Sequence, residues 1–135
     1  MYPVSQGFGE NPLDYPEYMG HPGIDWATPE GTPLMAPHDG VVVWAGASPA
    51  WPGRGIYLAV ETYGDGLEYY LMHLSGLAVT AGDAVDQGQL VAWSGSTGVF
   101  RWAGSPAPVR VKPHLHFDVR REGVPVDPAS LGIRA

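Results

Sequence analysis

The chain has 135 residues, a formal net charge of −7 and a single lysine, Lys112. The clustered basic side chains that bind nucleic-acid phosphates or anionic membranes are missing, so we expect neither nucleic-acid binding nor membrane insertion. Because there is no cysteine and no apolar run near the roughly 20 residues of a membrane span, disulfides, thiolate metal ligands and a transmembrane segment are excluded as well.

Glycine and proline divide the apolar residues into short runs that predict strands and tight turns. The chain has 19 glycines and 14 prolines, and no segment keeps an apolar period of 3.6 residues for three turns. In chain order, we expect strands at 40–45, 56–62, 67–74, 89–93 and 111–120. The turn Gly64-Asp65-Gly66 predicts a hairpin between the second and third strands, because glycine and aspartate tolerate the positive φ of hairpin turns.

The fold expected from these strands is mostly β, with little helix: one compact domain over residues 1–135, built on an antiparallel sheet of short strands. A second hairpin is expected at 121–123, before a closing segment at 126–128. Two longer irregular loops, 6–19 and 98–113, precede the histidine motifs. Such loops are often functional, although decoration of the surface explains them equally well. Their exposed-looking aromatic residues are Tyr15, Tyr18, Phe100 and Trp102.

The segment HPGID, residues 21–25, places a histidine four residues before an aspartate. Pro22 and Gly23 disfavour a helix, and in an extended strand His21 and Asp25 would lie about 13 Å apart. We therefore expect a bend at Pro22-Gly23 that lets both side chains reach one metal ion.

The segment HLHFDV, residues 114–119, alternates like a strand with one polar and one core face. His114, His116 and Asp118 point one way, and the apolar residues between them point the other way. His114 and His116 are about 6.6 Å apart at Cα, so one can bind a metal while the other lies beside it. The two motifs together offer the nitrogen and oxygen donors that zinc accepts, and the same set could hold Fe(II) in an oxygenase.

The remaining histidines are candidate proton carriers, since the chain lacks the His-Glu-x-x-His motif whose glutamate serves many zinc peptidases. His38 lies in a turn before a strand and is expected to be an ordinary surface residue. His73 ends a strand on the same face as Leu71, and from this position alone a structural and a catalytic role are equally open.

The chain resembles the lysostaphin-type zinc metallopeptidases, also called the LytM family. Besides the two histidine motifs, the resemblance includes GFGE at 7–10, YLMHLS at 70–75, AGDAVDQGQLVAWSGSTG at 81–98 and PVDP at 125–128. Order and spacing agree over nearly the whole chain. The resemblance implies a LytM-like fold with a duplicated hybrid motif and long groove-forming loops.

Five residues receive roles from this resemblance. His21, Asp25 and His116 match the ligands of one Zn²⁺ per chain. His73 and His114 match the catalytic histidines that flank the metal-bound water. Which of these two acts as the base stays open.

Four further residues are weaker candidates. Relatives often place a tyrosine near the oxyanion from the loop before the first motif, which points to Tyr15 or Tyr18 as a substrate contact. Trp102 is the corresponding candidate in the second loop. Asp118 either orients His116 or is simply solvated. The groove walls are expected to depart from the family, because the segment 99–112 is longer than usual and Met72 replaces a small residue.

The function implied by the resemblance is zinc-dependent hydrolysis of peptide bonds in bacterial peptidoglycan, in the cross-bridge or the stem peptide. The alternative is a catalytically inactive LytM-like module that binds wall components or a partner protein, although such relatives typically lose metal ligands. The segment GDAVDQGQLVAWSG at 82–95 also suits a lipoyl or biotinyl carrier domain, but the only lysine, Lys112, adjoins the His-x-His motif.

The place of action expected from the resemblance is the bacterial cell envelope or the extracellular space. The first residues, MYPVSQGFGE, contain no signal peptide, so we expect a trimmed leader, a phage lysin or another delivery route. The acidic balance disfavours adsorption to polyanionic wall polymers, so targeting is expected from another domain, a phage or envelope assembly, or the groove itself. The oligomeric state is left open.

Overall fold

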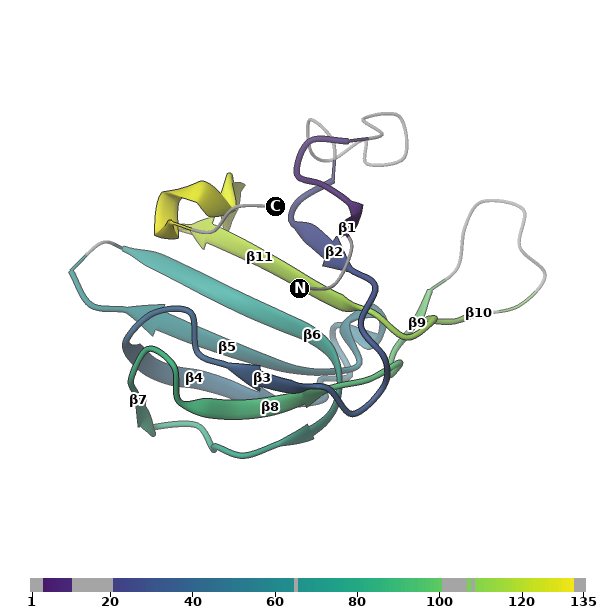
Figure 1. Cartoon of the computed structure of the whole chain (residues 1–135), viewed down its shortest axis with the longest axis horizontal. Helices are drawn as coiled ribbons and strands as arrows, with labels where there is room; N and C mark the ends of the chain where they lie inside the picture. Colours follow the sequence, from purple (N-terminus) through teal and green to yellow (C-terminus); the bar gives the residue numbers. More distant parts are fainter. Residues whose placement is uncertain (1–3, 11–20, 65, 101–106, 108, 133–135) are drawn as a thin grey trace.

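Antiparallel strands carry most of the regular structure in the computed structural model, which describes residues 4–10, 21–64, 66–100, 107 and 109–132 (Figure 1). The expected mostly β fold is confirmed. None of the helical segments in these residues has the length and apolar character of a membrane span. The elements described are β1 (Val4–Gln6), β2 (Ile24–Trp26), β3 (Pro33–Met35), β4 (Gly40–Gly46), η2 (Pro52–Arg54), β5 (Ile56–Thr62), β6 (Leu67–Leu77), β7 (Ala84–Val85), β8 (Leu90–Ser94), β9 (Val99–Phe100), β10 (Val109–Arg110), β11 (Leu115–Arg121), β12 (Val124–Val126) and η3 (Pro128–Leu131).

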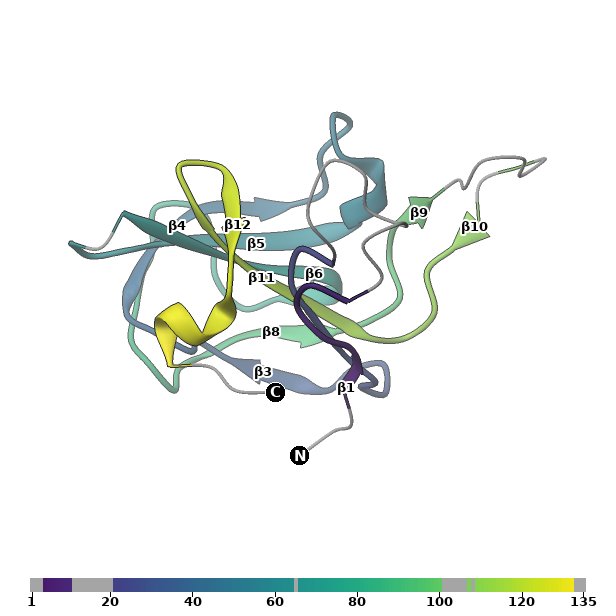
Figure 2. The same cartoon turned by 90° about the horizontal axis from the view of Figure 1, so that it is seen from above.

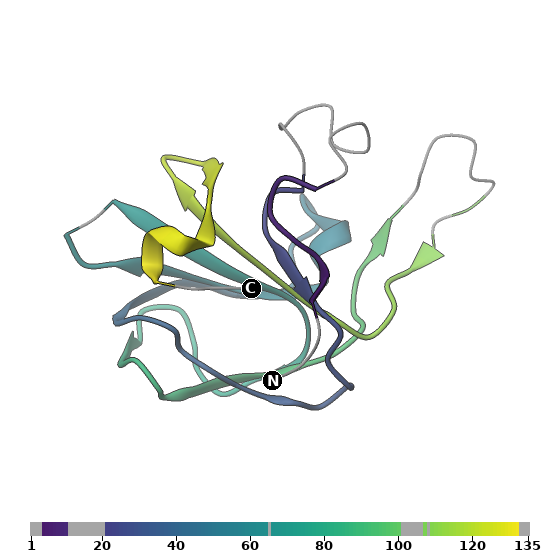
Figure 3. The same cartoon turned by 45° about the horizontal axis from the view of Figure 1, so that its top comes forward.

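The long strand β6 is the centre of the main sheet, whose order is β1-β2-β11-β6-β5-β4-β7. Its first part pairs with β5 and β11, and its last residues pair with β8, which in turn pairs with β3. As a result, β3 and β8 form a second layer that faces the main sheet (Figure 3). The hairpin of β9 and β10 is separate and projects past the edge of the main sheet (Figure 2).

The hydrophobic core lies between these two layers. Leu58 and Val60 on β5 and Val119 on β11 have no exposed surface, and Val91 on β8 closes the core from the other side. Side chains alternate along a strand, so the residues between these core positions face the opposite side of the main sheet. That second face is where polar side chains gather.

Four of the five expected strands coincide with β4, β5, β6 and β8, and both expected hairpins are present. The expected start of the fifth strand was wrong, because β11 begins at Leu115 instead of residue 111. Pro113 has no N–H to give to a sheet, and the Lys112 carbonyl accepts a hydrogen bond from His114 Nδ1 at 2.7 Å. The segment 98–113 is also less irregular than expected, since it contains β9 and β10.

Candidate metal centre

The neighbouring strands β2 and β11 bring the two histidine motifs together. Asp25 on β2 pairs directly with His116 on β11, and His116 Nδ1 lies 2.8 Å from Asp25 Oδ1. His21 precedes β2 and returns to the same point, with its Nε2 3.3 Å from Asp25 Oδ2. Three side chains from distant parts of the chain thus converge.

A bend at Pro22-Gly23, as expected from the sequence, turns His21 towards Asp25. A Cβ on Gly23 would overlap the Phe117 carbonyl oxygen, so only glycine lets the chain pass this close to β11. His21 Nδ1 lies 3.2 Å from the Gly7 carbonyl. When Nδ1 donates to that carbonyl, Nε2 keeps its lone pair for a metal ion.

The donor atoms of His21, Asp25 and His116 fit a tetrahedral cation. One donor atom of each lies within 4.8 Å of the other two. Zinc bonds of about 2.0–2.1 Å place the ligand atoms of a tetrahedron about 3.3 Å apart, which matches the separation of His21 Nε2 and Asp25 Oδ2. Two imidazoles and one carboxylate also leave a fourth position for water or substrate.

Both ring nitrogens of His116 face carboxylates: Nδ1 faces Asp25, and Nε2 lies 2.9 Å from Asp118 Oδ2. Burial alone would lower the pKa of His116, but the hydrogen bonds with Asp118 and Asp25 outweigh it and raise the pKa to about 9. Burial would raise the pKa of Asp25, yet the hydrogen bonds with His116 and His21 hold it well below its usual range. The mutual hydrogen bonds therefore favour the charged forms of His116 and Asp25 although both side chains are largely buried.

Asp118 is fully buried behind His116, so the interpretation of a solvated aspartate was wrong. Arg120 Nε and Nη2 donate to its two oxygens at 3.0 and 3.2 Å. Burial would raise the pKa of Asp118, but the hydrogen bonds with His116 and Arg120 lower it. The Arg120–Asp118–His116 chain fixes the orientation of the imidazole that faces Asp25.

His73 reaches the cluster through a break in the alternation of β6. Leu71 and Leu74 face the core, whereas Met72 and His73 both line the cavity of the cluster. The expectation that His73 shares a face with Leu71 was therefore wrong. His73 has a φ of 64°, and the pairing of β6 with both β5 and β8 shifts register around this point. Such a bulge re-aims one side chain to the other face of a strand.

His73 and His114 lie side by side, with ring centroids 4.6 Å apart. Each Nδ1 faces a backbone carbonyl: that of Thr97 at 3.0 Å for His73, and that of Lys112 at 2.7 Å for His114. Donation from Nδ1 leaves both Nε2 atoms free to exchange protons, and His114 Nε2 lies 3.8 Å from Asp25 Oδ1. Burial, together with the electrostatic effect of the neighbouring imidazoles of His114 and His116, lowers the pKa of His73 to about 4, so this ring is neutral at neutral pH.

Thr97 holds the backbone around His73, and sequence reasoning missed it. Its Oγ1 donates to the Leu74 carbonyl at 2.6 Å and accepts from the Ile56 N–H at 3.1 Å. A Cβ on Gly55 would overlap the Thr97 backbone, so these two segments need glycine to touch. Gly55 and Gly98, which follow Arg54 and Thr97, are the sequence trace of this contact.

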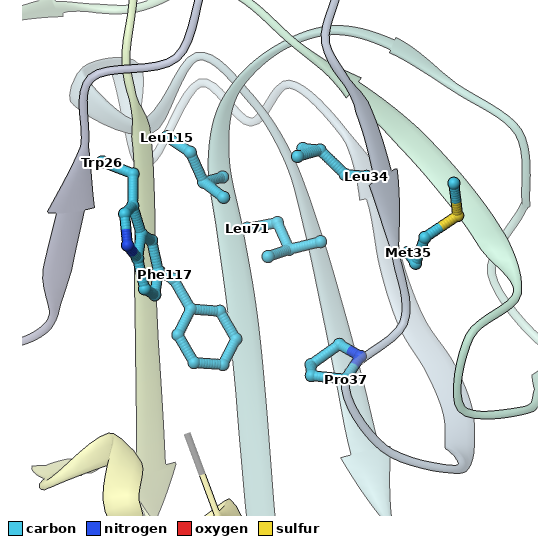
Figure 4. Close-up of a pocket in the computed structure, with 7 residues that line it drawn as sticks. All are labelled: Trp26, Leu34, Met35, Pro37, Leu71, Leu115 and Phe117. Carbon is cyan, nitrogen blue, oxygen red and sulfur yellow. The ribbon is translucent and has the colours of Figure 1, made fainter. Parts of the chain in front are cut away.

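One cavity of about 370 Å³ collects all five residues to which the resemblance assigns roles. A second cavity, of about 140 Å³, lies on the core face of β11 and is lined by apolar residues (Figure 4). It offers no titratable side chain, so chemistry belongs to the first cavity. That first cavity is lined by His21, Asp25, Gly53, Met72, His73, Val111, His114 and His116.

The other predicted residues fall into two groups. Tyr15, Tyr18 and Trp102 lie outside the described residues, so their predicted contacts with substrate stay predictions. His38 is not in the cluster, and its Nδ1 lies 2.9 Å from the carbonyl of the adjacent Asp39.

Comparison with known proteins gives this cavity a context. Residues 19–128 match the model described as peptidase family M23. Glycyl-glycine endopeptidase ALE-1 of Staphylococcus capitis is 39% identical over 116 residues, which cover 86% of this chain and 28% of that protein. DD-carboxypeptidase/endopeptidase Mpg of Neisseria meningitidis serogroup B is 34% identical over 113 residues, covering 84% and 23%.

A solved structure with the same fold is the catalytic domain of lysostaphin from Staphylococcus simulans, with a TM-score of 0.69. The two are 34% identical, and the match covers 96% of this chain and 86% of that one. The chain spans about a quarter of the length of the curated relatives it matches.

Proposed function

The chain belongs to peptidase family M23, and from that premise we propose that it is a zinc-dependent endopeptidase that hydrolyses peptide bonds in bacterial peptidoglycan. The observation that carries the proposal is the single cavity in which two histidines and an aspartate meet at metal-ligand spacing beside two further histidines. Relatives named as endopeptidases support the same reaction class.

In the proposed enzyme, His21 Nε2, Asp25 and His116 Nδ1 hold the metal. A zinc ion held by these atoms would supply Lewis acidity, which would lower the pKa of a bound water and polarise the carbonyl of the scissile bond. Of the two metal-binding chemistries open to this donor set, hydrolysis fits better than iron-dependent oxygenation, because two proton-carrying histidines adjoin the ligands.

His73 and His114 carry the protons in this proposal. A neutral His73 accepts a proton at Nε2, and the imidazole of His114 stands next to it at 20% exposure. Together they take a proton from the attacking water and return one to the leaving amine. Their geometry serves either order of the two steps. The inactive-module alternative has less support, because all five residues to which the resemblance assigns roles line one cavity.

The proposed enzyme forms a single catalytic domain over residues 1–135 that acts at the bacterial envelope or outside the cell. Since longer relatives contain such a domain as about a quarter of their length, delivery and wall targeting are assigned to another domain or a larger assembly. The acidic charge of −7 fits a unit that does not adsorb to polyanions by itself.

Digestion of purified peptidoglycan sacculi tests the proposal. The zinc-loaded protein should contain one zinc per chain and release fragments with new amino termini, identified by mass spectrometry. His73→Ala should keep the metal and lose turnover, whereas His116→Ala should lose both. His38→Ala is the matched histidine outside the cavity and should behave like wild type. Stoichiometric iron in place of zinc, or equal digestion by wild type and His73→Ala, would contradict the proposal.

A further inference from the structure

Arg54 is a cation beside the metal centre that has no carboxylate partner in the described part of the chain. It ends the η2 turn, directly after Gly53, which lines the cavity of the metal centre. The ion pairs found among the described residues involve histidines and Arg120, and none involves Arg54. Among the described residues, this half-buried charge thus has no carboxylate partner, although the chain is strongly acidic.

The guanidinium of Arg54 is fixed by aromatic rings. Its Cζ lies 4.2 Å from the ring centroid of Trp51, 5.0 Å from that of Tyr57 and 5.2 Å from that of Tyr70. Stacking engages the flat face of a guanidinium and leaves the N–H donors along its rim available. The rings therefore hold Arg54 in one orientation without satisfying its hydrogen bonds.

The aromatic rings around Arg54 also stack on one another. Trp44 stacks on Tyr57 with ring centroids 5.7 Å apart, and Tyr57 stacks on Tyr70 at 6.3 Å. Tyr57 lies between these two rings and is only 5% exposed, whereas Trp44 and Trp51 are 37% and 53% exposed. The guanidinium rim is the charged recognition element of this cluster.

The position of Arg54 places that rim within reach of a bound peptide. On β6, Met72 pairs with His116 and Tyr70 pairs with Asp118, so Tyr70 lies one same-face step from the wall of the cavity. One such step is about 6.6 Å, and an extended peptide advances about 3.3 Å per residue. Arg54, above Tyr70, is then about two residues away from a bond held at the metal centre.

Arg120 shows what a satisfied arginine looks like at the same ring. Its Cζ lies 4.9 Å from the centroid of Tyr70, but it also donates two hydrogen bonds to Asp118. The positive charge of Arg120 is therefore compensated within the protein by the Asp118 carboxylate. Arg54, on the same ring, has no such partner among the residues that the structure describes, so its guanidinium can pair with a carboxylate of another molecule.

We propose that Arg54 forms a carboxylate-binding subsite that selects acidic peptides, with a free carboxylate about two residues from the cleaved bond, over neutral peptides such as oligoglycine. The inference rests on the proposed peptidase function and narrows its substrate class. A planar guanidinium binds a carboxylate through two parallel hydrogen bonds, which gives position as well as affinity. It also offsets locally the repulsion that a chain of charge −7 exerts on an acidic peptide.

Paired peptides test the subsite. Glutamate is placed at each position around the cleaved bond, each peptide is compared with its glutamine counterpart, and kcat/KM is measured for wild type, Arg54→Gln and Arg121→Gln. Arg121 is an exposed arginine at the far end of β11 and controls for net charge. At one position wild type should prefer glutamate, and Arg54→Gln should lose about 10- to 100-fold on that peptide alone. Equal losses on both peptides, or no preference in wild type, would overturn the proposal.

Binding to an inactive protein separates this proposal from the peptidase proposal. Calorimetric titration of the best glutamate peptide and its glutamine counterpart into His73→Ala, with and without Arg54→Gln, needs no turnover. Tighter binding of the glutamate peptide that disappears with Arg54→Gln supports the subsite even if no peptide is cleaved. Absence of that difference removes the subsite and leaves the peptidase proposal standing.

Discussion

The two faces of strand β11 solve the problem of burial in opposite ways. Phe117 and Val119 pack into the core with 3% and 0% exposure, and Phe117 contacts the rings of Trp26 and Tyr69. On the other face, His116 and Asp118 are buried almost as deeply, at 8% and 0%, but as charged groups in a chain of hydrogen bonds. Side chains on both faces of β11 are thus buried, but only one face carries titratable groups.

This contrast implies that substitutions on the two faces of β11 should impair different properties of the protein. Removing core atoms costs stability through lost contacts and a cavity. Removing one member of a buried charge network leaves its partner uncompensated and misplaces a ligand. Substitutions on neighbouring residues of β11 should therefore separate folding from chemistry.

The largest effect should come from His116→Ala. If His116 is one of three zinc ligands, as proposed, its loss should abolish zinc binding and lower kcat/KM by at least about 1,000-fold. Metal analysis of the purified variant and digestion of sacculi check this, with circular dichroism to show that the β fold persists. Retained stoichiometric zinc would show that His116 is not a ligand.

Phe117→Ala, one residue along, should have the converse effect. The free energy of unfolding should fall by about 3–5 kcal/mol, because a buried ring leaves a cavity beside Tyr69 and Trp26. Urea denaturation measures this loss. The folded fraction should still bind one zinc per chain, and a variant that is stable but metal-free would break the separation of the two faces.

Asp118→Asn sharpens the comparison, because it keeps the shape and removes the charge behind His116. Zinc affinity should drop about 10- to 100-fold, as is typical when a carboxylate that orients a ligand histidine is changed. Competition with a chelating dye gives the affinity. The control variant Asp86→Asn removes an exposed carboxylate and should leave the zinc affinity unaltered.

Thr97→Val should lower kcat about tenfold with little change in KM, because it removes the hydroxyl hydrogen bonds that hold the chain opposite His73. Thr97→Ser keeps the hydroxyl and should restore most of the rate. If Thr97→Val only lowers the melting temperature and kcat stays at the wild-type value, Thr97 supports the fold but does not position His73.

The pH dependence of zinc binding gives a graded test of the same charged network. His116, whose pKa is raised to about 9, holds a proton that zinc must displace. Affinity should therefore fall as pH drops below about 9, by at most about tenfold per unit. Dye competition between pH 7 and 9 measures the slope. In Asp118→Asn, which removes a hydrogen bond that raises this pKa, the dependence should begin at lower pH.

The metal-ligand candidates and most strands were accessible from the sequence, since both depend on local patterns. The alternation of His114, Leu115 and His116 marks a strand with two unlike faces, and Pro22-Gly23 marks a bend. The resemblance to a known family then supplied the roles. The register between β2 and β11, two neighbouring strands of the sheet, places Asp25 opposite His116.

The side to which His73 points was not accessible, because it depends on a bulge that β5 and β8 impose on β6 from outside. Simple alternation sends His73 into the core. The burial of Asp118 was missed for a related reason: its partner Arg120 is two residues away, a spacing that also suits a solvated edge. Contacts set by packing of distant segments leave little local trace.

Ninety-one residues separate Asp25 from His116 along the chain. An ion held by both ties the first strands to the last ones, as a disulfide would in a chain that had cysteine. Such a cross-link closes a long loop, which restricts the unfolded ensemble. An ion that binds only the folded form also adds its binding free energy to the stability of that form. Removal of the ion by a chelator should then lower the stability of the whole fold as well as stop its chemistry. An active molecule is therefore one in which the first and last strands are held together.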